Sequence, residues 1–201
     1  AHAKTIIIDK NIVIDGRENI DEVLSEKKGL IIVGAHIGNW ELGGVTLGTI
    51  GYSVNAVVLP HAYKKVDTFF NAKRESRGLR AIPLGRAVRN CLEVFKRNEI
   101  LCLLGDRDFT QGGIIADFFG LPAMIPRGPA AFSLKNDVPL VVGFMVGEKN
   151  DKLRLFFNKR IKFVPTGEYE RDLLELTRIY LRQIEDCIRK YPDQWYMFRR
   201  F

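Results

Sequence analysis

Short apolar runs alternate with amphipathic segments along most of the chain. The runs are short and rich in β-branched residues, which is typical of buried strands, whereas the segments between them repeat with the period of a helix. We therefore predict strands at residues 5–8, 12–14, 30–34, 54–59, 79–83, 100–104, 114–119, 140–146, 153–157 and 160–163, the first two as a short hairpin or paired strands. We predict helices at residues 19–27, 39–49, 64–77, 86–97, 128–135 and 169–190.

This order of elements indicates the fold class. Repeated strand–helix units predict an α/β fold with a layered, mixed, largely parallel sheet flanked by helices. The 201 residues contain no internal repeat, low-complexity stretch or linker, so we expect a single domain over residues 1–201. Apolar runs such as residues 139–146 are far shorter than the ~20 residues that cross a bilayer.

A histidine and an acid follow the apolar run at residues 30–33. His36 lies where this strand ends, and Glu41 follows five residues later. A histidine exchanges protons near neutral pH, and a neighbouring carboxylate fixes its tautomer. Because positions five apart do not share a helix face, the two side chains meet only if a helix begins between them, with Asn39 as its N-cap. The alternative is an ordinary loop histidine followed by ordinary helix-start residues.

A second group of charged residues follows the apolar run at residues 100–104. Asp106, Arg107 and Asp108 come directly after this predicted strand. In a parallel sheet they lie at the same edge as His36, where ligand sites of open α/β sheets are found. Asp106 is therefore an alternative partner for the histidine, and Arg107 is a candidate for binding phosphate. A salt-bridge cluster without a catalytic part is the competing interpretation.

The segment 118–130 is rich in turn residues and leads into a predicted helix. Gly128 and the proline after it suit a helix start, where backbone N–H groups are available to an anion or an oxyanion. Arg127 adds positive charge at the same place. The aromatic residues are expected either to line an apolar pocket or to pack in the core; those considered are Trp40, Phe118 and Phe119.

The chain carries a net charge of +7. This charge indicates attraction to an acidic partner, such as nucleic acid, an anionic membrane surface, an acidic carrier protein or a phosphorylated substrate. Part of it gathers around the helix predicted at 64–77, at Lys64, Lys65, Lys73, Arg74, Arg77 and Arg80. This cluster is either a surface for acidic headgroups or proteins, or a solvated helix face. Without an ordered basic–aromatic platform, we expect no nucleic-acid partner.

The absence of several familiar motifs argues against some classes of enzyme. The sequence has no GxSxG, Walker A, GxGxxG or HExxH motif. Cys91, Cys102 and Cys187 are isolated, and we expect them to be reduced and inert. A catalytic histidine is expected at His36 or His61, and direct base-assisted transfer to a hydroxyl fits better than a covalent serine or cysteine route. We expect neither a metal nor a bound cofactor.

Four motifs of the chain occur in a combination that is far more specific than any one of them. They are GAHIGNWELGG at 34–44, which contains a His-x4-Glu signature, GDRDF at 105–109, the segment FFGLPAMIPRGPA at 118–130, and YPDQWYMFRRF at 191–201. Together they resemble the bacterial lipid A biosynthesis acyltransferase family, which includes lauroyl and myristoyl transferases and is related to phosphatidylinositol mannoside acyltransferases. The similarity begins near Gly29, and it implies a glycerolipid acyltransferase-like fold.

This resemblance implies transfer of a fatty acyl chain from an acyl thioester to a hydroxyl of a bacterial glycolipid. The co-substrate would be acyl carrier protein or coenzyme A, and the acceptor a lipid A precursor or a phosphatidylinositol mannoside. His36 would be the general base and Glu41 its acidic partner by motif, while Asp106 lies where some relatives have a second acid. Residues expected to bind substrate are Asn39, Trp40, Arg74, Arg77, Arg107, Asp108, Phe118, Phe119, Arg127 and Gly128.

The resemblance also implies work at a membrane. Members of the family usually carry a longer N-terminal portion with a membrane-anchoring helix, which we do not find in this sequence. We therefore expect peripheral association with the cytoplasmic face of the inner membrane. The alternative functions are a thioesterase or lipid hydrolase, with water as the acceptor, and a non-catalytic binder of anionic lipid.

Overall fold

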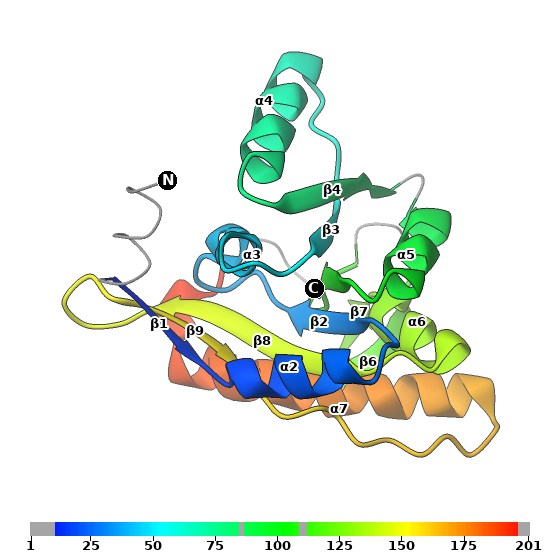
Figure 1. Ribbon diagram of the computed structural model, residues 1–201. Helices are drawn as coiled ribbons and strands as arrows, with labels where there is room; N and C mark the ends of the chain where they lie inside the picture. The colour runs from blue at the N-terminus through cyan, green and yellow to red at the C-terminus, as the bar shows by residue number, and fades with distance from the viewer. Residues whose placement is uncertain (1–10, 85–86, 109–111, 197–201) are drawn as a thin grey trace.

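The computed structural model describes residues 11–84, 87–108 and 112–196, and it contains a seven-stranded sheet with helices on both faces (Figure 1). The strand order is β1–β9–β8–β2–β5–β3–β4. The strands are β1 Ile12–Asp15, β2 Leu30–Gly34, β3 Val54–Val58, β4 Leu79–Pro83, β5 Ile100–Leu104, β8 Leu140–Gly147 and β9 Leu153–Phe157. Every neighbouring pair is parallel except β8 and β9. The expected α/β fold with a largely parallel sheet is confirmed.

The helices and a separate hairpin complete the described part of the chain. The helices are α2 Arg17–Ser25, α3 Trp40–Thr49, α4 Lys64–Glu75, α5 Ala87–Lys96, α6 Gly128–Asn136 and α7 Tyr169–Lys190, followed by the 3₁₀ turn η2 Pro192–Gln194. The hairpin consists of β6 Ile114–Phe118 and β7 Leu121–Ile125. Within these described ranges, no helix has the length and apolar character needed to cross a bilayer.

The central strand β2 divides the core into two parts. Ile31 and Val33 point into a cluster that includes buried residues of α5, α6 and α7. Leu30 and Ile32 point to the other face, into a cluster that includes buried residues of α2 and α3. Successive side chains of a strand face opposite ways, so a strand covered on both faces is a continuous apolar run. This is why the run at β2 was recognisable in the sequence.

Glycines allow α3 to lie close to its neighbours. A Cβ on Gly43 would lie 3.3 Å from the Cβ of Met145 on β8, and a Cβ on Gly48 would lie 2.6 Å from the backbone oxygen of Arg77. The second distance is too short for any other residue without a shift of the backbone. These close approaches pack α3 against β8 and against the segment that follows α4.

Most predicted elements of the described ranges are confirmed to within about two residues, but β7 was not predicted. Its segment contains prolines at positions 122 and 126, and it looked like a turn. In the structure the two-residue turn Phe119–Gly120 closes a hairpin, and both residues have positive φ angles of 56° and 79°. That geometry suits a tight hairpin. Pro122 is tolerated because a two-stranded hairpin leaves one side of each strand without a partner.

The chain after β9 also differs from expectation. Residues 160–163 form no strand, although Ile161 N–H donates to the carbonyl of Leu140 at 2.9 Å and is buried. This segment therefore follows β8 through isolated hydrogen bonds rather than a continuous ladder. Residues 12–15 pair with β9. The strand predicted at 5–8 lies outside the described residues.

Candidate active site

His36 and Asp106 meet because they follow adjacent strands at the same level. β2 and β5 are parallel neighbours, and their register pairs Gly34 with Leu104. Each side chain comes two residues after its strand's last paired position. His36 Nδ1 lies 2.8 Å from Asp106 Oδ1, and the backbone N–H of His36 donates to Asp106 Oδ2 at 3.0 Å. The sheet itself thus positions this pair.

The Asp106 carboxylate is fully buried and accepts a third hydrogen bond, from Trp195 Nε1 at 3.2 Å. Burial by itself would raise the pKa of Asp106, but the hydrogen bonds and charge of His36 outweigh it, and the pKa lies below its ordinary value. An ionised carboxylate only accepts hydrogen bonds, so the proton of the contact lies on His36 Nδ1. The other ring nitrogen, Nε2, then carries a lone pair that can accept a proton.

The segment after α7 closes the loop that carries the histidine. Tyr196 N–H donates to the carbonyl of His36 at 2.8 Å, and Gly38 N–H donates to the carbonyl of Gln194 at 2.9 Å. Trp195 reaches Asp106 from between these two bonds. Trp195 was not predicted as a site residue, although it lies in the motif at 191–201. The signal that could have identified it is a tryptophan within a polar motif.

Glu41 is held by an arginine of another helix. The helix begins where expected, because Asn39 Oδ1 accepts the N–H of Leu42 at 3.0 Å and caps α3. Glu41 lies in the first turn of α3, and its two carboxylate oxygens accept from Arg74 Nε, at 2.9 Å, and from Arg74 Nη2. The two acids considered for one task therefore have different contacts: Asp106 bonds the histidine ring, and Glu41 ties α3 to α4.

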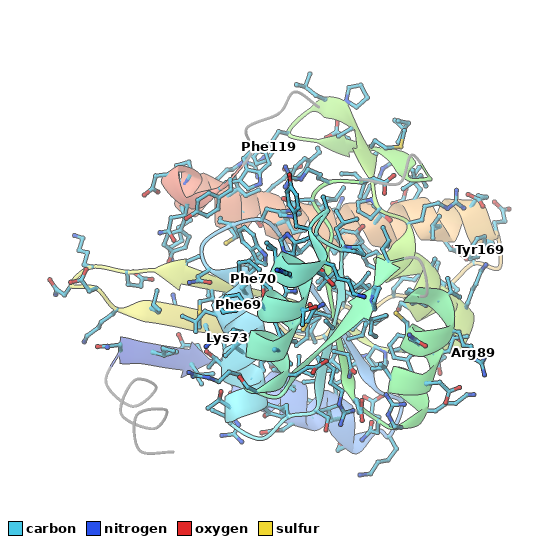
Figure 2. All side chains as sticks on the ribbon, turned by 90° about the horizontal axis from the view of Figure 1, so that it is seen from above. Phe69, Phe70, Lys73, Arg89, Phe119 and Tyr169 are labelled. Atoms are coloured by element: carbon cyan, nitrogen blue, oxygen red, sulfur yellow. The ribbon has the colours of Figure 1, made fainter. Side chains whose placement is uncertain are left out.

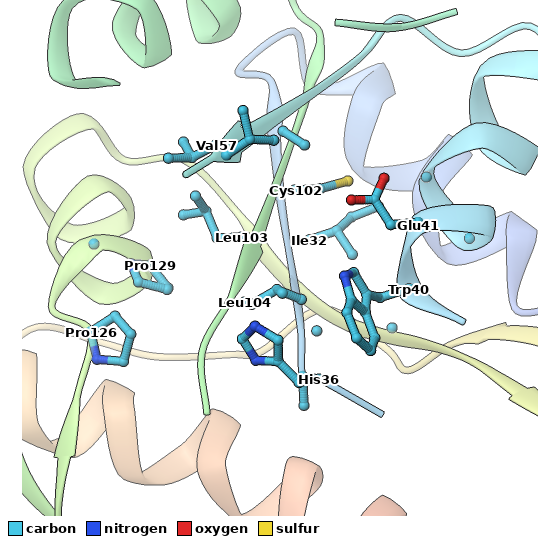
Figure 3. Close-up of a pocket in the computed structure, with 18 of the residues that line it drawn as sticks. Ile32, His36, Trp40, Glu41, Val57, Cys102, Leu103, Leu104, Pro126 and Pro129 are labelled. Atoms are coloured by element: carbon cyan, nitrogen blue, oxygen red, sulfur yellow. The ribbon is translucent and has the colours of Figure 1, made fainter. Parts of the chain in front are cut away.

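A cavity of about 680 Å³ opens beside the histidine (Figure 3). Apolar side chains from β2, β3, β5 and α6 form most of its wall, among them Ile32, Val57, Leu103 and Phe132. Its polar lining residues are His36, Glu41, His61, Arg74, Arg107, Asp108 and Arg127. Trp40 also lines it and packs edge-on against the His36 ring, with centroids 5.2 Å apart. The volume is typical of a pocket for a small molecule or part of a lipid, ~300–1,000 Å³.

Four of the expected substrate-binding residues lie elsewhere. Phe118 and Phe119 pack against the Trp195 ring, each with centroids 5.9 Å apart, and are not among the cavity-lining residues. The unpredicted hairpin turns them toward α7, where the guanidinium of Arg189 lies 5.0 Å from the Phe119 ring. Arg77 is exposed beyond the end of α4. Asn39 lines a smaller neighbouring hollow, where its side chain caps α3.

The start of α6 forms another part of the cavity wall. Gly128 is the first residue of this helix, and a Cβ on it would meet nothing within 4 Å. The first N–H groups of a helix have no partner within that helix and favour negative charge. The Arg127 guanidinium is already paired with the Glu170 carboxylate, at 2.6 and 2.8 Å. The backbone is therefore a better candidate than this arginine for stabilising an oxyanion.

Cys102 also lines the cavity but is poorly suited to attack a substrate. Burial raises the pKa of this thiol to about 12. The nucleophilic form of cysteine is the thiolate, which is scarce at neutral pH when the pKa is that high. The histidine is therefore better suited than the thiol to carry out chemistry in this cavity.

Comparisons with known proteins connect this site to lipid enzymes. The chain is 31% identical over 137 residues to a phosphatidylinositol mannoside acyltransferase of Mycobacterium tuberculosis, covering 64% of this chain and 42% of that protein. It is 28% identical over 127 residues to a protein of the same name in Mycolicibacterium smegmatis, covering 61% and 42%. It is 23% identical over 193 residues to the lipid A biosynthesis palmitoleoyltransferase of Escherichia coli, covering 94% and 60%. The chain thus spans less than half the length of the mycobacterial relatives.

A family model gives the broadest match. The model described as bacterial lipid A biosynthesis acyltransferase matches residues 4–201, which is nearly the whole chain. The motifs that placed His36 at a strand end lie within this match. The chain therefore belongs to the bacterial lipid A biosynthesis acyltransferase family.

Proposed function

We propose that this protein transfers a fatty acyl chain from an acyl thioester to a hydroxyl of a bacterial glycolipid, with His36 as the general base. The observation that carries the proposal is the His36–Asp106 pair at the wall of a largely apolar cavity. Family membership and the names of the similar proteins agree with acyl transfer. Asp106 is the positioning acid in this mechanism, and Glu41 holds the cavity wall through Arg74.

The proton moves through one ring nitrogen. The acceptor hydroxyl attacks the thioester carbonyl carbon while His36 Nε2 takes its proton. Asp106 stabilises the resulting imidazolium and keeps Nδ1 as the donor. The tetrahedral intermediate then collapses, the C–S bond breaks, and the imidazolium returns its proton to the leaving thiolate. No covalent acyl-enzyme is needed.

The cavity supplies the remaining requirements. An acyl chain would lie along the apolar wall formed by residues such as Ile32, Val57 and Leu103. The oxyanion would form near the start of α6, where the Gly128 amide is the leading donor candidate. Loss of one such donor typically lowers turnover by about 10²–10³-fold.

Family membership and the charge of the site support our proposal for the donor and the acceptor. The donor is an acyl thioester of acyl carrier protein or coenzyme A, and both carriers bear phosphate that Arg107 can bind. The acceptor is a lipid A precursor or a phosphatidylinositol mannoside-type glycolipid. With such an acceptor, the proposed site of action is the cytoplasmic face of the inner membrane, with peripheral association.

The test is product analysis with purified protein. Mixed acyl thioesters are offered with a panel of glycolipid precursors, and the products are identified by mass spectrometry. His36→Ala is expected to lower transfer by about 10²–10⁴-fold, because a positioned base is lost, while its melting temperature stays near that of the parent. A folded His36→Ala variant with near-normal transfer would refute the proposal. Release of free fatty acid at the same rate with and without glycolipid would assign a thioesterase instead.

A further inference from the structure

Helix α4 shows an arrangement of polar and apolar side chains that is unusual for a helix on a water-exposed surface. Such helices normally bury an apolar stripe and expose a polar one. No side chain of α4 is buried, and its least exposed residues are Asp67, Asn71 and Arg74, which are all polar. These three share one face, because they are four and three positions apart.

Hydrogen bonds hold this polar face against the protein. Asn71 Nδ2 donates to Asp67 Oδ2 at 3.1 Å, and Arg74 Nη1 donates to Asn71 Oδ1 at 2.9 Å. Arg74 then pairs with Glu41, and the backbone N–H of His61 donates to Asp67 Oδ1 at 3.0 Å. The helix is thus attached by a chain of polar contacts rather than by an apolar core.

The apolar residues of α4 are left exposed. Val66, Phe69 and Phe70 follow helical spacing, and 39%, 57% and 44% of their surfaces are accessible. Tyr63, directly before the helix, is 78% exposed. Figure 2 shows Phe69 and Phe70 with Lys73 along one side of α4. Side chains of this size are costly to leave in water. The stripe therefore indicates a surface that another molecule covers when the protein functions.

The charge around the stripe indicates what covers it. Lys64, Lys65 and Lys73 are exposed, and Lys73 Nζ lies 5.6 Å from the centre of the Phe69 ring. The acids on α4 are the half-buried Asp67, which is hydrogen-bonded, and the exposed Glu75. Aromatic and aliphatic residues flanked by lysines are typical of helices that lie in the plane of an anionic bilayer.

The position of the stripe relates it to the cavity. Phe70 stacks on the ring of His61, with centroids 5.0 Å apart, and His61 lines the cavity, as does Arg74 of the same helix. The helix stands away from the sheet on the side where the cavity wall is formed by β3 (Figure 1). A lipid surface in contact with the stripe would therefore lie next to the cavity that is to receive an acyl chain.

We infer that α4 and Tyr63 form the surface by which the protein docks on an anionic lipid bilayer, with Tyr63, Val66, Phe69 and Phe70 inserted at the level of the headgroups and Lys64, Lys65 and Lys73 facing lipid phosphates. The inference rests on the proposed function in explaining why this surface borders the cavity. The docking itself requires no turnover, so it is tested separately.

The experiment measures co-sedimentation of the full chain with vesicles. One set contains phosphatidylcholine alone, and the other contains equal parts of phosphatidylcholine and phosphatidylglycerol. The parent is expected to prefer the anionic vesicles, and added salt is expected to weaken the preference. Phe69→Ser with Phe70→Ser removes the inserted rings, and Lys64→Gln with Lys65→Gln and Lys73→Gln removes three charges. Each combination is expected to lower partitioning onto anionic vesicles by about 10²-fold.

Matched controls distinguish vesicle binding by this surface from non-specific hydrophobic or electrostatic binding. Val164→Ser removes an apolar side chain that is 86% exposed elsewhere, and Lys149→Gln with Lys152→Gln and Lys159→Gln removes the same charge from another exposed region. Both are expected to bind vesicles like the parent. The inference is overturned if the α4 variants bind like the parent, or if the controls lose as much.

Two further measurements keep docking apart from catalysis and from a protein partner. His36→Ala is expected to keep vesicle binding while losing transfer, so a failure of the proposed function leaves this result intact. If the lysine variant binds vesicles normally but no longer binds purified acyl carrier protein, the surface recognises the acidic carrier, and lipid docking is refuted.

Discussion

Replacement of Asp106 by asparagine tests the mechanism most directly. The Asp106 carboxylate accepts from His36 Nδ1 at 2.8 Å, from the His36 backbone at 3.0 Å and from Trp195 Nε1 at 3.2 Å. Asparagine keeps one acceptor oxygen, which can serve the two donors that lie on the Oδ2 side. Its amide NH₂ group then faces Nδ1 and forces the opposite tautomer, with the proton on Nε2. The base is lost although the ring keeps its place.

The expected magnitude follows from the loss of a correctly oriented base. Turnover should fall by about 10²–10⁴-fold, which corresponds to about 3–5 kcal/mol of activation free energy. Initial rates at saturating acyl thioester and glycolipid measure this effect, with the melting temperature as a check on folding. Glu41→Gln is the matched control. It neutralises the acid of the His-x4-Glu signature in the same way but leaves the Asp106–His36 contact untouched.

The pH dependence of stability gives a second measurement on the same residue. The pKa of Asp106 is lower in the folded protein than in the unfolded chain, so the ionised carboxylate contributes stability above its unfolded pKa. That stability is lost as the pH falls through the folded pKa. Asp106→Asn should therefore flatten the decline of stability in acid.

The proposed role of Asp106 in turnover is refuted if a folded Asp106→Asn variant turns over within about tenfold of the parent while Glu41→Gln loses about 10²-fold or more.

Three other features lead to direct measurements. Gly48→Ala should destabilise the protein by about 1–3 kcal/mol, because its Cβ would lie 2.6 Å from a backbone oxygen, whereas Gly44→Ala meets only a leucine side chain at 3.2 Å and should cost less. Chemical denaturation compares the two, and equal losses would contradict this. Val57→Trp should fill part of the cavity and shift the products toward shorter acyl chains, as read by mass spectrometry from mixed thioesters; an unchanged chain-length profile would show that the acyl chain lies elsewhere. Cys102 should resist iodoacetamide at neutral pH, because with a pKa of about 12 fewer than about one thiol in 10⁴ is ionised, and rapid labelling followed by mass spectrometry would disprove this.

Sequence patterns predicted the sheet well because its strands obey simple rules. β2 and β5 are covered on both faces and therefore appear as uninterrupted apolar runs. The amphipathic pattern of α7 gave its bounds, Tyr169–Lys190, without error. The strand at β7 was missed because Pro122 lies within it and Pro126 directly follows it, and only the pairing with β6 shows that the hairpin tolerates Pro122.

The sequence predicted His36 with two alternative acidic partners, Glu41 and Asp106, but it did not decide between them. The order of β2 and β5 in the sheet decides which acid faces His36, and strand order is a property of the whole fold rather than of a local motif. Glu41 is nearer in the sequence, yet the direction of α3 turns it to Arg74. Trp195 comes from a distant segment, and nothing in its local pattern ties it to Asp106.

The hydrogen bonds of residues 194–196 have a consequence for biosynthesis. On the ribosome, β2 and β5 emerge long before the indole that completes the environment of Asp106. A nascent chain without this segment can assemble the neighbouring strands. The loop around His36 then lacks the two backbone hydrogen bonds that it forms with residues 194 and 196. The complete environment of Asp106 therefore forms only after residues 194–196 have been made, later than β2, α4 and β5.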